Sequence, residues 1–276
     1  RTLFVYLPRS YENTETEYPV HYLSDAPATS TLFYSILNLH SKTGEMPAGI
    51  VVGLSSNNRE ENLHIGKGAE KYLAFLEKEV IPFIEAKYRT NSFRSINGHS
   101  LGGGFALYAF FSRMSLFNAV IGVSPYPVSG LKDIIGSAPR EYDSPGERFI
   151  YGSAGTVKDI PAADITALKE AVERREWRNV TTSFHINKGE SHISNSPVTF
   201  QDGLEMIYAD WKFTLPEQGA ASPLELLKEH YRKLSERMGY RVIPDEHQVI
   251  YPVMDKLGRR REFAKAIDLL TYSTGL

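Results

Sequence analysis

The sequence contains no cysteine. Disulfides, thiolate metal sites and a cysteine nucleophile are therefore excluded. No apolar run approaches the roughly 18 residues that cross a bilayer, so no membrane span is predicted. Neither sign of charge is in excess, since 31 Lys and Arg residues stand against 33 Asp and Glu residues. This balance gives no electrostatic reason to expect nucleic acid or an anionic membrane as a partner.

The composition that remains is ordinary for a globular protein, with 42% hydrophobic and 23% charged residues in a chain of 276. Short apolar runs rich in β-branched residues alternate with stretches of helical periodicity. The runs predict strands over 2–7, 18–23, 50–54, 93–97, 117–123, 148–151 and 180–186, and the periodic stretches predict helices over 69–88, 163–176 and 200–211 and directly after Gly102. This alternation is typical of an α/β protein with a mostly parallel sheet covered on both faces.

The character of the chain changes after about Pro216, where no strand signal returns. Residues 218–222 read as a linker, and Ser222 and Pro223 are typical of a helix start. Two more helical stretches follow, around 245–257 and 260–271. We therefore predict two parts: an α/β domain over residues 1–216 and a small helical appendage over 222–276.

A G-x-S-x-G pentapeptide, Gly98-His99-Ser100-Leu101-Gly102, lies between a predicted strand and a predicted helix. In this context a serine occupies a tight, strained turn that lifts its hydroxyl above the sheet. The glycines are needed because side chains there would collide with the neighbouring strand and helix. Ser100 is thus the predicted nucleophile, and the N–H of Leu101 is the first predicted oxyanion donor.

A serine hydroxyl needs a base, which follows the nucleophile in chains of this type. Four histidines qualify by order. His185 lies inside a predicted strand, and His230 and His247 lie in the appendage. His192 lies in a polar loop directly after the last predicted strand. A base needs such a loop to bring its ring over the serine, so His192 is the predicted general base.

The carboxylate that would orient this base should follow the strand at 148–151. Asp159 and Asp164 both qualify by position, and Asp164 also suits the cap of the helix that follows it. We predict Asp159 and keep Asp164 as the alternative. Glu190 is a further candidate, although it lies close in sequence to His192. A dyad without a closely placed acid stays open.

The second oxyanion donor is expected in the loop after the second strand, over residues 24–28. Pro27 has no N–H to donate. Ala26 and Ala28 remain, and we predict Ala26.

Several segments together resemble the putative serine esterase family of the α/β-hydrolase superfamily. Its members include siderophore esterases, feruloyl and acetyl-xylan esterases, S-formylglutathione hydrolases and mycolyltransferases. The chain is most similar to the siderophore-esterase-like branch. The matching segments are 1–8, 18–23 with Asp25, 79–85, 88–90, 98–103, 124–125, His192 and 202–204.

The resemblance implies an α/β-hydrolase fold and hydrolysis of a small-molecule ester through an acyl-enzyme, with neither metal nor organic cofactor. It maps the nucleophile to Ser100 and the base to His192. Arg59 matches an arginine common in this branch and is a candidate for binding an anionic or catecholate substrate, or else a structural ion-pairing residue. His99 and Tyr126 are the other candidate substrate-binding residues.

The resemblance also suggests a periplasmic or secreted protein and leaves a cytoplasmic location open. The appendage resembles a fragment of a tetratricopeptide-like unit, which favours packing on the hydrolase domain or in a homodimer. Two alternatives to hydrolysis stay open. The same site would also suit acyl transfer to an acceptor other than water, and a non-catalytic binding protein can retain the fold.

Overall fold

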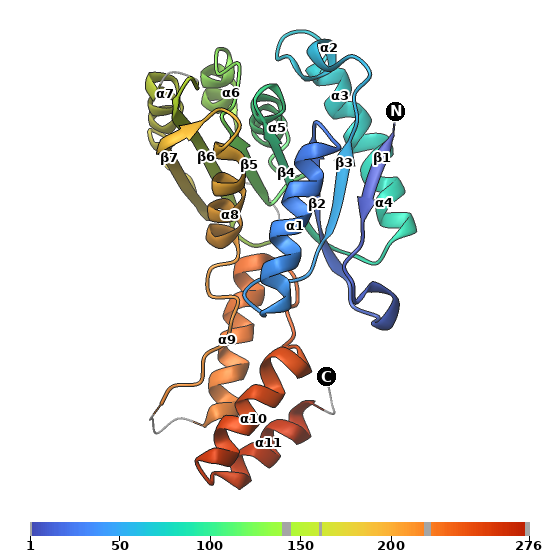
Figure 1. The fold of residues 1–276 in the computed structure, drawn as a ribbon, viewed down its shortest axis with the longest axis vertical. Helices are drawn as coiled ribbons and strands as arrows, with labels where there is room; N and C mark the ends of the chain where they lie inside the picture. Colours follow the sequence, from blue (N-terminus) through green and yellow to red (C-terminus); the bar gives the residue numbers. More distant parts are fainter. Residues whose placement is uncertain (1, 140–144, 160–161, 218–221, 274–276) are drawn as a thin grey trace.

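The computed structural model describes residues 2–139, 145–159, 162–217 and 222–273 (Figure 1). The strands are β1 (Leu3–Tyr6), β2 (Tyr18–Ser24), β3 (Ile50–Leu54), β4 (Thr90–His99), β5 (Ala119–Val123), β6 (Arg148–Val157) and β7 (Val180–Ser191). The α-helices are α1 (Ala28–Lys42), α2 (Arg59–Leu63), α3 (Ala69–Phe75), α4 (Ile81–Lys87), α5 (Leu101–Ser112), α6 (Leu131–Ser137), α7 (Ala162–Glu173), α8 (Asn195–Ile207), α9 (Pro223–Met238), α10 (Tyr251–Arg259) and α11 (Phe263–Ser273). Short 3₁₀ or π segments are η1 (Tyr11–Asn13), η2 (Leu76–Val80) and η3 (Glu246–Ile250).

The strands form one seven-stranded sheet in the order β1-β3-β2-β4-β5-β6-β7. β1 pairs antiparallel with β3, and the other neighbouring pairs are parallel. This confirms the predicted mostly parallel sheet. Parallel strands bring their carboxyl ends to one edge, where ligands bind in such folds. β4 is the central strand, so the residues that follow it stand midway along this edge.

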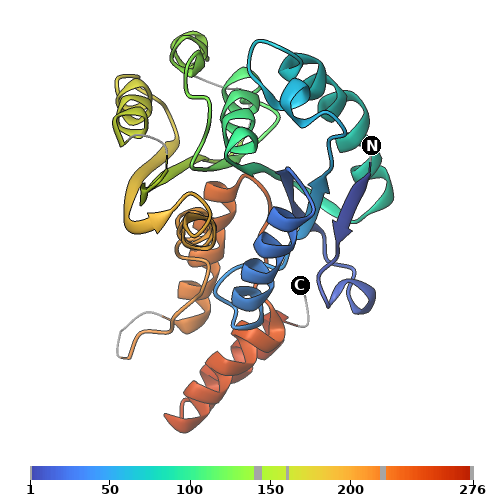
Figure 2. The ribbon, with the colours of Figure 1, turned by 45° about the horizontal axis from the view of Figure 1, so that its top comes forward.

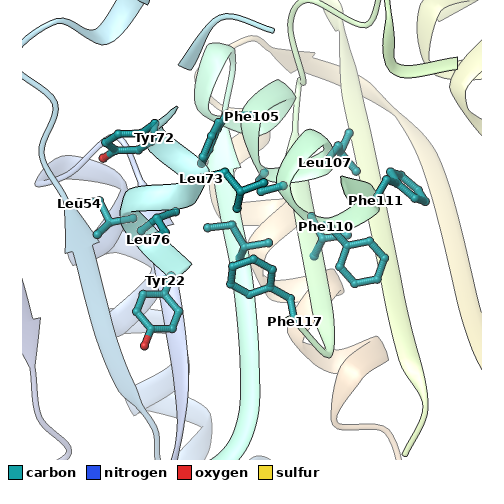
Figure 3. Close-up of a cluster of buried hydrophobic side chains, with 14 of the residues drawn as sticks. Tyr22, Leu54, Tyr72, Leu73, Leu76, Phe105, Leu107, Phe110, Phe111 and Phe117 are labelled. Carbon is teal, nitrogen blue, oxygen red and sulfur yellow. The ribbon is translucent and has the colours of Figure 1, made fainter. Parts of the chain in front are cut away.

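Helices cover both faces of the sheet, and successive side chains of each strand point to opposite faces. Tyr22 and Ile96 pack with residues of α3 and α5 in one buried cluster, part of which Figure 3 shows. Leu23 and Phe149 pack with residues of α1 and α8 in a second cluster on the other face. The core is therefore two apolar layers with the sheet between them, which fixes the strands that carry the site.

The helices differ from the sequence-based prediction in several places. α1 occupies the segment for which no element is predicted, because its buried apolar side chains are only Phe33 and Leu37 and give no clear period. α2 and α6 are short helices that were not predicted either. The helix predicted over 69–88 is divided: a π-helical turn, η2, separates α3 from α4 just before Pro82, a residue that disfavours a continuous helix.

The appendage lies beyond the end of the sheet opposite the Ser100 turn, and α9 connects it to the domain (Figures 1 and 2). Leu227 and Tyr231 of α9 belong to the same buried cluster as Phe149 of the sheet. Arg237 pairs with Glu147 at 3.0 Å. The predicted linker falls largely on residues 218–221, which lie outside the described residues. The division into two domains stays a prediction. No helix in the described ranges is long and apolar enough to cross a membrane.

Candidate active site

Ser100 occupies the turn between β4 and α5 in a strained backbone conformation, with φ 56° and ψ -123°. A positive φ is uncommon outside glycine and concentrates at functional sites. Neighbouring backbone holds the turn on both sides. The Ser100 N–H donates to the carbonyl of Val123 at 2.9 Å, and the Ser100 carbonyl accepts from the N–H of Tyr126 at 2.9 Å. The predicted strand–turn–helix setting of the pentapeptide is therefore present.

The glycines of the turn are required by contact. A Cβ on Gly98 would lie 2.3 Å from both the Gly102 carbonyl oxygen and Ser24 Oγ. A Cβ on Gly102 would lie 2.8 Å from Ser24 Oγ. Ser24 Oγ itself donates to the Gly102 carbonyl at 2.9 Å. The end of β2 thus packs directly against the serine turn, and side chains at either glycine would push it away.

The two predicted oxyanion donors differ in their surroundings. Leu101 is the first residue of α5, so its N–H has no acceptor within the helix. The N–H of Ala26 instead donates to the carbonyl of Leu54 at 3.1 Å and is engaged in the sheet in this structure. Ala28 begins α1, where its N–H lacks an acceptor within the helix. The engagement of Ala26 weighs against it as the second donor and leaves Ala28 as the alternative.

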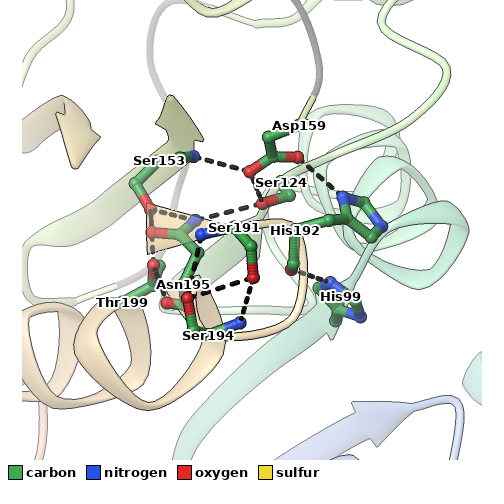
Figure 4. A network of polar contacts seen from close by, with 10 residues as sticks. His99, Ser124, Ser153, Asp159, Ser191, His192, Ser194, Asn195 and Thr199 are labelled. Carbon is green, nitrogen blue, oxygen red and sulfur yellow. Dashed lines mark hydrogen bonds and ion pairs between the residues drawn. The ribbon is translucent and has the colours of Figure 1, made fainter. Parts of the chain in front are cut away.

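His192 and Asp159 lie together at the carboxyl edge of the sheet (Figure 4). His192 directly follows β7, and Asp159 follows β6, the strand beside it. The His192 Nδ1 lies 2.6 Å from Asp159 Oδ1, within the distance expected for a triad acid. The Asp159 side chain is fully buried, whereas that of His192 is 31% exposed. A buried carboxylate against Nδ1 would set the ring's tautomer and stabilise its protonated form.

The alternative acids lie elsewhere. Asp164 lies in the first turn of α7, which begins at Ala162, two residues before the predicted cap position. Its side chain lines a surface pocket with Tyr126. Among the described residues, neither Asp164 nor Glu190 forms an ion pair with His192. The Glu190 carbonyl packs against Gly155, where a Cβ would lie 2.2 Å from its oxygen.

His99, the residue before Ser100, contacts the predicted base, His192. Its Nε2 donates to the backbone carbonyl of His192 at 2.7 Å, and the two ring centroids are 4.5 Å apart. Burial lowers the pKa of His99, and a carbonyl accepts only, so at neutral pH its proton lies on Nε2. His99 therefore contacts the backbone of His192, and its role in binding substrate stays a prediction.

Among the described residues, no hydrogen bond joins the proposed nucleophile to the proposed base. Within the part of the chain that the structure describes, Ser100 Oγ has no hydrogen bond to His192, and the His192 Nε2 has no partner. Catalytic hydrogen bonds are often long in empty sites and shorten when substrate binds. His192 Nε2 is therefore free to accept a proton.

Arg59 opens α2 and pairs with Asp25, the residue that follows β2. Its Nε lies 2.7 and 2.6 Å from the two carboxylate oxygens, and its Nη2 lies 2.6 Å from Oδ2. Asp25 has a φ of 78°, so the loop that carries Ala26 is tied to α2 at a strained residue. The ion-pairing interpretation of Arg59 is thus what the structure shows, and a bound anion would compete with Asp25 for it.

Tyr126 lies on the other side of the serine turn and is 57% exposed. It borders a pocket of 330 Å³ whose lining includes Val128, Lys132 and Leu168. Neither Ser100 nor His192 lines this pocket, and Tyr126, whose N–H donates to the Ser100 carbonyl, connects it to the serine turn. No group of three His, Asp or Glu side chains in the described ranges is placed to hold a metal ion.

Ser124 and Asn195 were not predicted, and both contact the acid or its neighbours. Ser124 Oγ donates to Asp159 Oδ2 at 2.7 Å, and Asn195 Nδ2 donates to Ser124 Oγ at 3.0 Å (Figure 4). A weak signal for each exists in the sequence. Ser124 directly follows a buried strand, and Asn195 comes three residues after His192.

The sequence matches the family described as Putative esterase over residues 1–249. The chain belongs to this family. The match includes the whole predicted α/β domain and continues into the appendage.

Curated relatives are siderophore esterases. The chain is 36% identical over 90 residues to the siderophore enterobactin esterase of Emericella nidulans. This alignment covers 32% of this chain and 27% of that protein. It is 26% identical over 175 residues to the siderophore triacetylfusarinine C esterase of Aspergillus fumigatus, covering 53% and 60% respectively. The chain therefore spans between about a quarter and three fifths of these relatives.

Solved structures share the fold at low identity. An IroE-like serine hydrolase from Shewanella oneidensis superposes with a TM-score of 0.79 at 20% identity, over 98% of this chain and 93% of its own. The siderophore hydrolase EstB from Aspergillus nidulans gives 0.62 at 20% identity, over 77% of this chain and 92% of its own. These matches confirm the α/β-hydrolase fold. The match over 98% of this chain includes the helical appendage. The match to EstB covers 77% of this chain, so it need not include the appendage.

Proposed function

We propose that this protein is a serine esterase that cleaves a carboxylic ester through an acyl-enzyme, with Ser100 as nucleophile, His192 as general base and Asp159 as the orienting acid. The observation that carries the proposal is the 2.6 Å contact between His192 Nδ1 and the buried Asp159, and the strained backbone of Ser100 in the G-x-S-x-G turn supports it. A histidine oriented in this way suits proton transfer with a serine hydroxyl.

In the first half-reaction, Ser100 Oγ attacks the ester carbonyl carbon and its proton passes to His192 Nε2. Asp159 accepts the Nδ1 hydrogen bond of the imidazolium that results. The carbonyl oxygen becomes an oxyanion, which the N–H of Leu101 binds at the helix start. The C–O bond to the alcohol then breaks, and His192 gives its proton to the departing alkoxide.

In the second half-reaction, a water molecule gives a proton to His192 Nε2 and attacks the acyl carbonyl. The bond between Ser100 Oγ and the acyl carbon then breaks, His192 returns a proton to Ser100 Oγ, and the carboxylic acid product leaves. The second oxyanion donor would be Ala28, or Ala26 after it releases the Leu54 carbonyl. Either route places one donor on each side of the oxyanion, from α5 and from the loop after β2.

The substrate class we propose is a siderophore-type ester, supported by the names of the curated relatives. Arg59 would bind an anionic or catecholate group at the mouth of the site by exchanging part of its contact with Asp25. Tyr126 would form a wall for the remaining part of the substrate. We propose that His99 contributes to the floor of the substrate-binding site, where it also contacts the His192 backbone.

A panel of esters tests the proposal. Purified protein is given nitrophenyl, feruloyl and catecholate siderophore esters and a glutathione thioester, with added alcohols to reveal acyl transfer. We expect ester hydrolysis, and a fluorophosphonate probe should label Ser100. Ser194→Ala is a matched control that should still be labelled. Labelling of a serine other than 100, or turnover that survives Ser100→Ala, would contradict the proposal. A homodimer also stays a prediction, which light scattering of the same sample checks.

A further inference from the structure

We infer that Ser124 and Asn195 are positioning residues, two buried hydrogen-bonded side chains that orient the Asp159 carboxylate so that its Oδ1 faces His192. Neither residue touches the proposed reacting atoms, and neither is needed by the three-residue scheme. The inference rests on the proposed function, because it assigns how the acid of that site is held.

Two donors contact the Asp159 carboxylate oxygen that faces away from His192. Its Oδ2 accepts a hydrogen bond from Ser124 Oγ at 2.7 Å and another from the Gly155 N–H at 2.6 Å. Its Oδ1 faces His192 Nδ1 at 2.6 Å. Two donors on one oxygen fix the plane of the carboxylate, and this plane sets where the imidazole ring must lie.

The direction of each hydrogen bond in the chain follows from chemistry. A carboxylate accepts only, so the single proton of Ser124 must point at Asp159. Ser124 Oγ therefore accepts from Asn195, whose Nδ2 lies 3.0 Å away. The amide of Asn195 is fixed in turn, because its Oδ1 accepts from Asn187 Nδ2 at 2.7 Å. The reversed amide would set its oxygen against Ser124 Oγ and its NH₂ group against that of Asn187, so Asn195 donates to Ser124 and Ser124 donates to Asp159.

The hydrogen-bonded side chains are also buried. Ser124 and Asn195 have no exposed surface, and the side chain of Asp159 has none. Hydrogen bonds are stronger in such surroundings, and an unmade one is costly. Ser124 also holds a φ of 40°, an unfavourable backbone conformation for a residue with a side chain. Strain at a buried serine whose hydroxyl contacts the acid is typical of a residue kept for its function.

Asn195 connects the acid to the base. It is the first residue of α8, and His192 lies in the short turn just before that helix. Its Nδ2 also donates to Ser153 Oγ of β6 at 3.0 Å, so it joins the start of α8 to the strand that precedes Asp159. The same residue thus fixes the spacing between the two segments that carry the acid and the base (Figure 4).

A double-mutant cycle tests whether Ser124 acts through Asp159. We expect Ser124→Ala to lower kcat about 10- to 100-fold with KM nearly unchanged, the range typical of groups that orient a catalytic side chain. In an Asp159→Asn background the same change should cost less than about twofold, because the residue it positions is already altered. Losses that multiply fully in the double variant would overturn the inference.

A matched control separates positioning from a general loss of stability. Ser95 is likewise a fully buried serine hydrogen bonded to a neighbour, but it lies away from the site. Ser95→Ala removes the same atoms and should lower the melting temperature while leaving kcat unchanged. If both variants lose the same activity, Ser124 has only a structural role.

A second readout does not depend on turnover. The Nδ1 proton of His192, shared with Asp159, should give a low-field proton resonance in the wild-type protein. We expect Ser124→Ala and Asn195→Ala to shift or broaden it, and Ser95→Ala to leave it unchanged. An unchanged resonance in both site variants would overturn the inference. If the resonance responds as expected but no ester is hydrolysed, the proposed function fails and the positioning role stands.

Discussion

His21 and His192 have contrasting surroundings, the first in the buried sheet and the second at its carboxyl edge. His21 lies in β2, opposite Ser95 of β4, and its Nδ1 is 2.8 Å from Ser95 Oγ. Its Nε2 is 3.2 Å from the Tyr208 hydroxyl, and its ring is fully buried. Burial lowers the pKa of His21 to about 3, so it stays neutral at ordinary pH. His192 has a carboxylate on Nδ1, a free Nε2 and a partly exposed ring.

The difference shows that the residue types do not decide the role. His21 has both ring nitrogens occupied by hydroxyl groups and has no carboxylate to stabilise a positive charge. It serves as a neutral hydrogen-bonding group in the core. His192 lies where parallel strands end, and there loops supply an acid on one side and open space on the other.

The largest expected effect comes from the two serines. Ser100→Ala should reduce ester hydrolysis by about 10⁴-fold or more and leave stability nearly unchanged. Ser95→Ala should retain activity and cost about 1–3 kcal/mol, because it leaves a buried His21 nitrogen unpaired. Initial rates and urea unfolding of both variants check this. Equal activity losses would remove the distinction between the two pairs.

The histidine of the site should behave as one unit with its serine. His192→Ala should lower kcat nearly as far as Ser100→Ala, about 10³- to 10⁴-fold, and the double variant should lose little more. The measurement is kcat on the best ester of the panel, with circular dichroism to confirm the fold. Full multiplication of the two losses would indicate separate roles.

The acid gives a smaller effect and separates the triad from the dyad. Asp159→Asn should lower kcat about 10²- to 10⁴-fold with little change in KM, since the ring would lose the partner that sets its tautomer. Asp164→Asn is the matched control and should leave the rate nearly unchanged, because Asp164 lies in α7 away from His192. Steady-state kinetics of both decide the matter. A rate insensitive to Asp159→Asn would favour a dyad.

The smallest expected effect is a pH dependence of stability from His21. Its folded pKa of about 3 lies below its unfolded value, so the unfolded chain binds the extra proton and stability falls as pH drops below about 6.5. Between pH 7 and pH 5 this group should cost about 2 kcal/mol. His21→Gln keeps hydrogen bonding without titrating and should lose that part of the slope. Urea unfolding at the two pH values measures it, and an unchanged slope would contradict the assignment.

The sequence was sufficient for the α/β-hydrolase fold and for the places of Ser100, His192 and Asp159. The alternation of strands and helices is visible in the apolar periodicity of the sequence. The G-x-S-x-G turn can be recognised from its own five residues, because its glycines are required by local steric contacts. Asp159 was preferred to Asp164 only by position, and the structure places it 2.6 Å from the ring. The catalytic roles themselves stay predictions.

The remaining features depend on contacts between distant segments. Ser124 and Asn195 are 71 residues apart, and no local pattern indicates that their side chains meet. The N–H of Ala26 is engaged by Leu54, a backbone contact that sequence spacing does not reveal. Arg59 and Asp25 have opposite charges, but many such pairs exist in a chain with this composition. α1 was not predicted because only two of its apolar side chains, Phe33 and Leu37, are buried, which gives no clear period.

The buried cluster that α9 shares with the sheet has a consequence for how the protein unfolds. Arg237 of α9 donates to the carbonyls of Ala209 and Met206 and lies over the ring of Phe149. Met238 next to it is fully buried in the same cluster. Separating the appendage would expose this apolar surface to water. Unfolding of either part would therefore destabilise the other. Calorimetry should therefore give a single cooperative transition, with its enthalpy drawn from both parts at once.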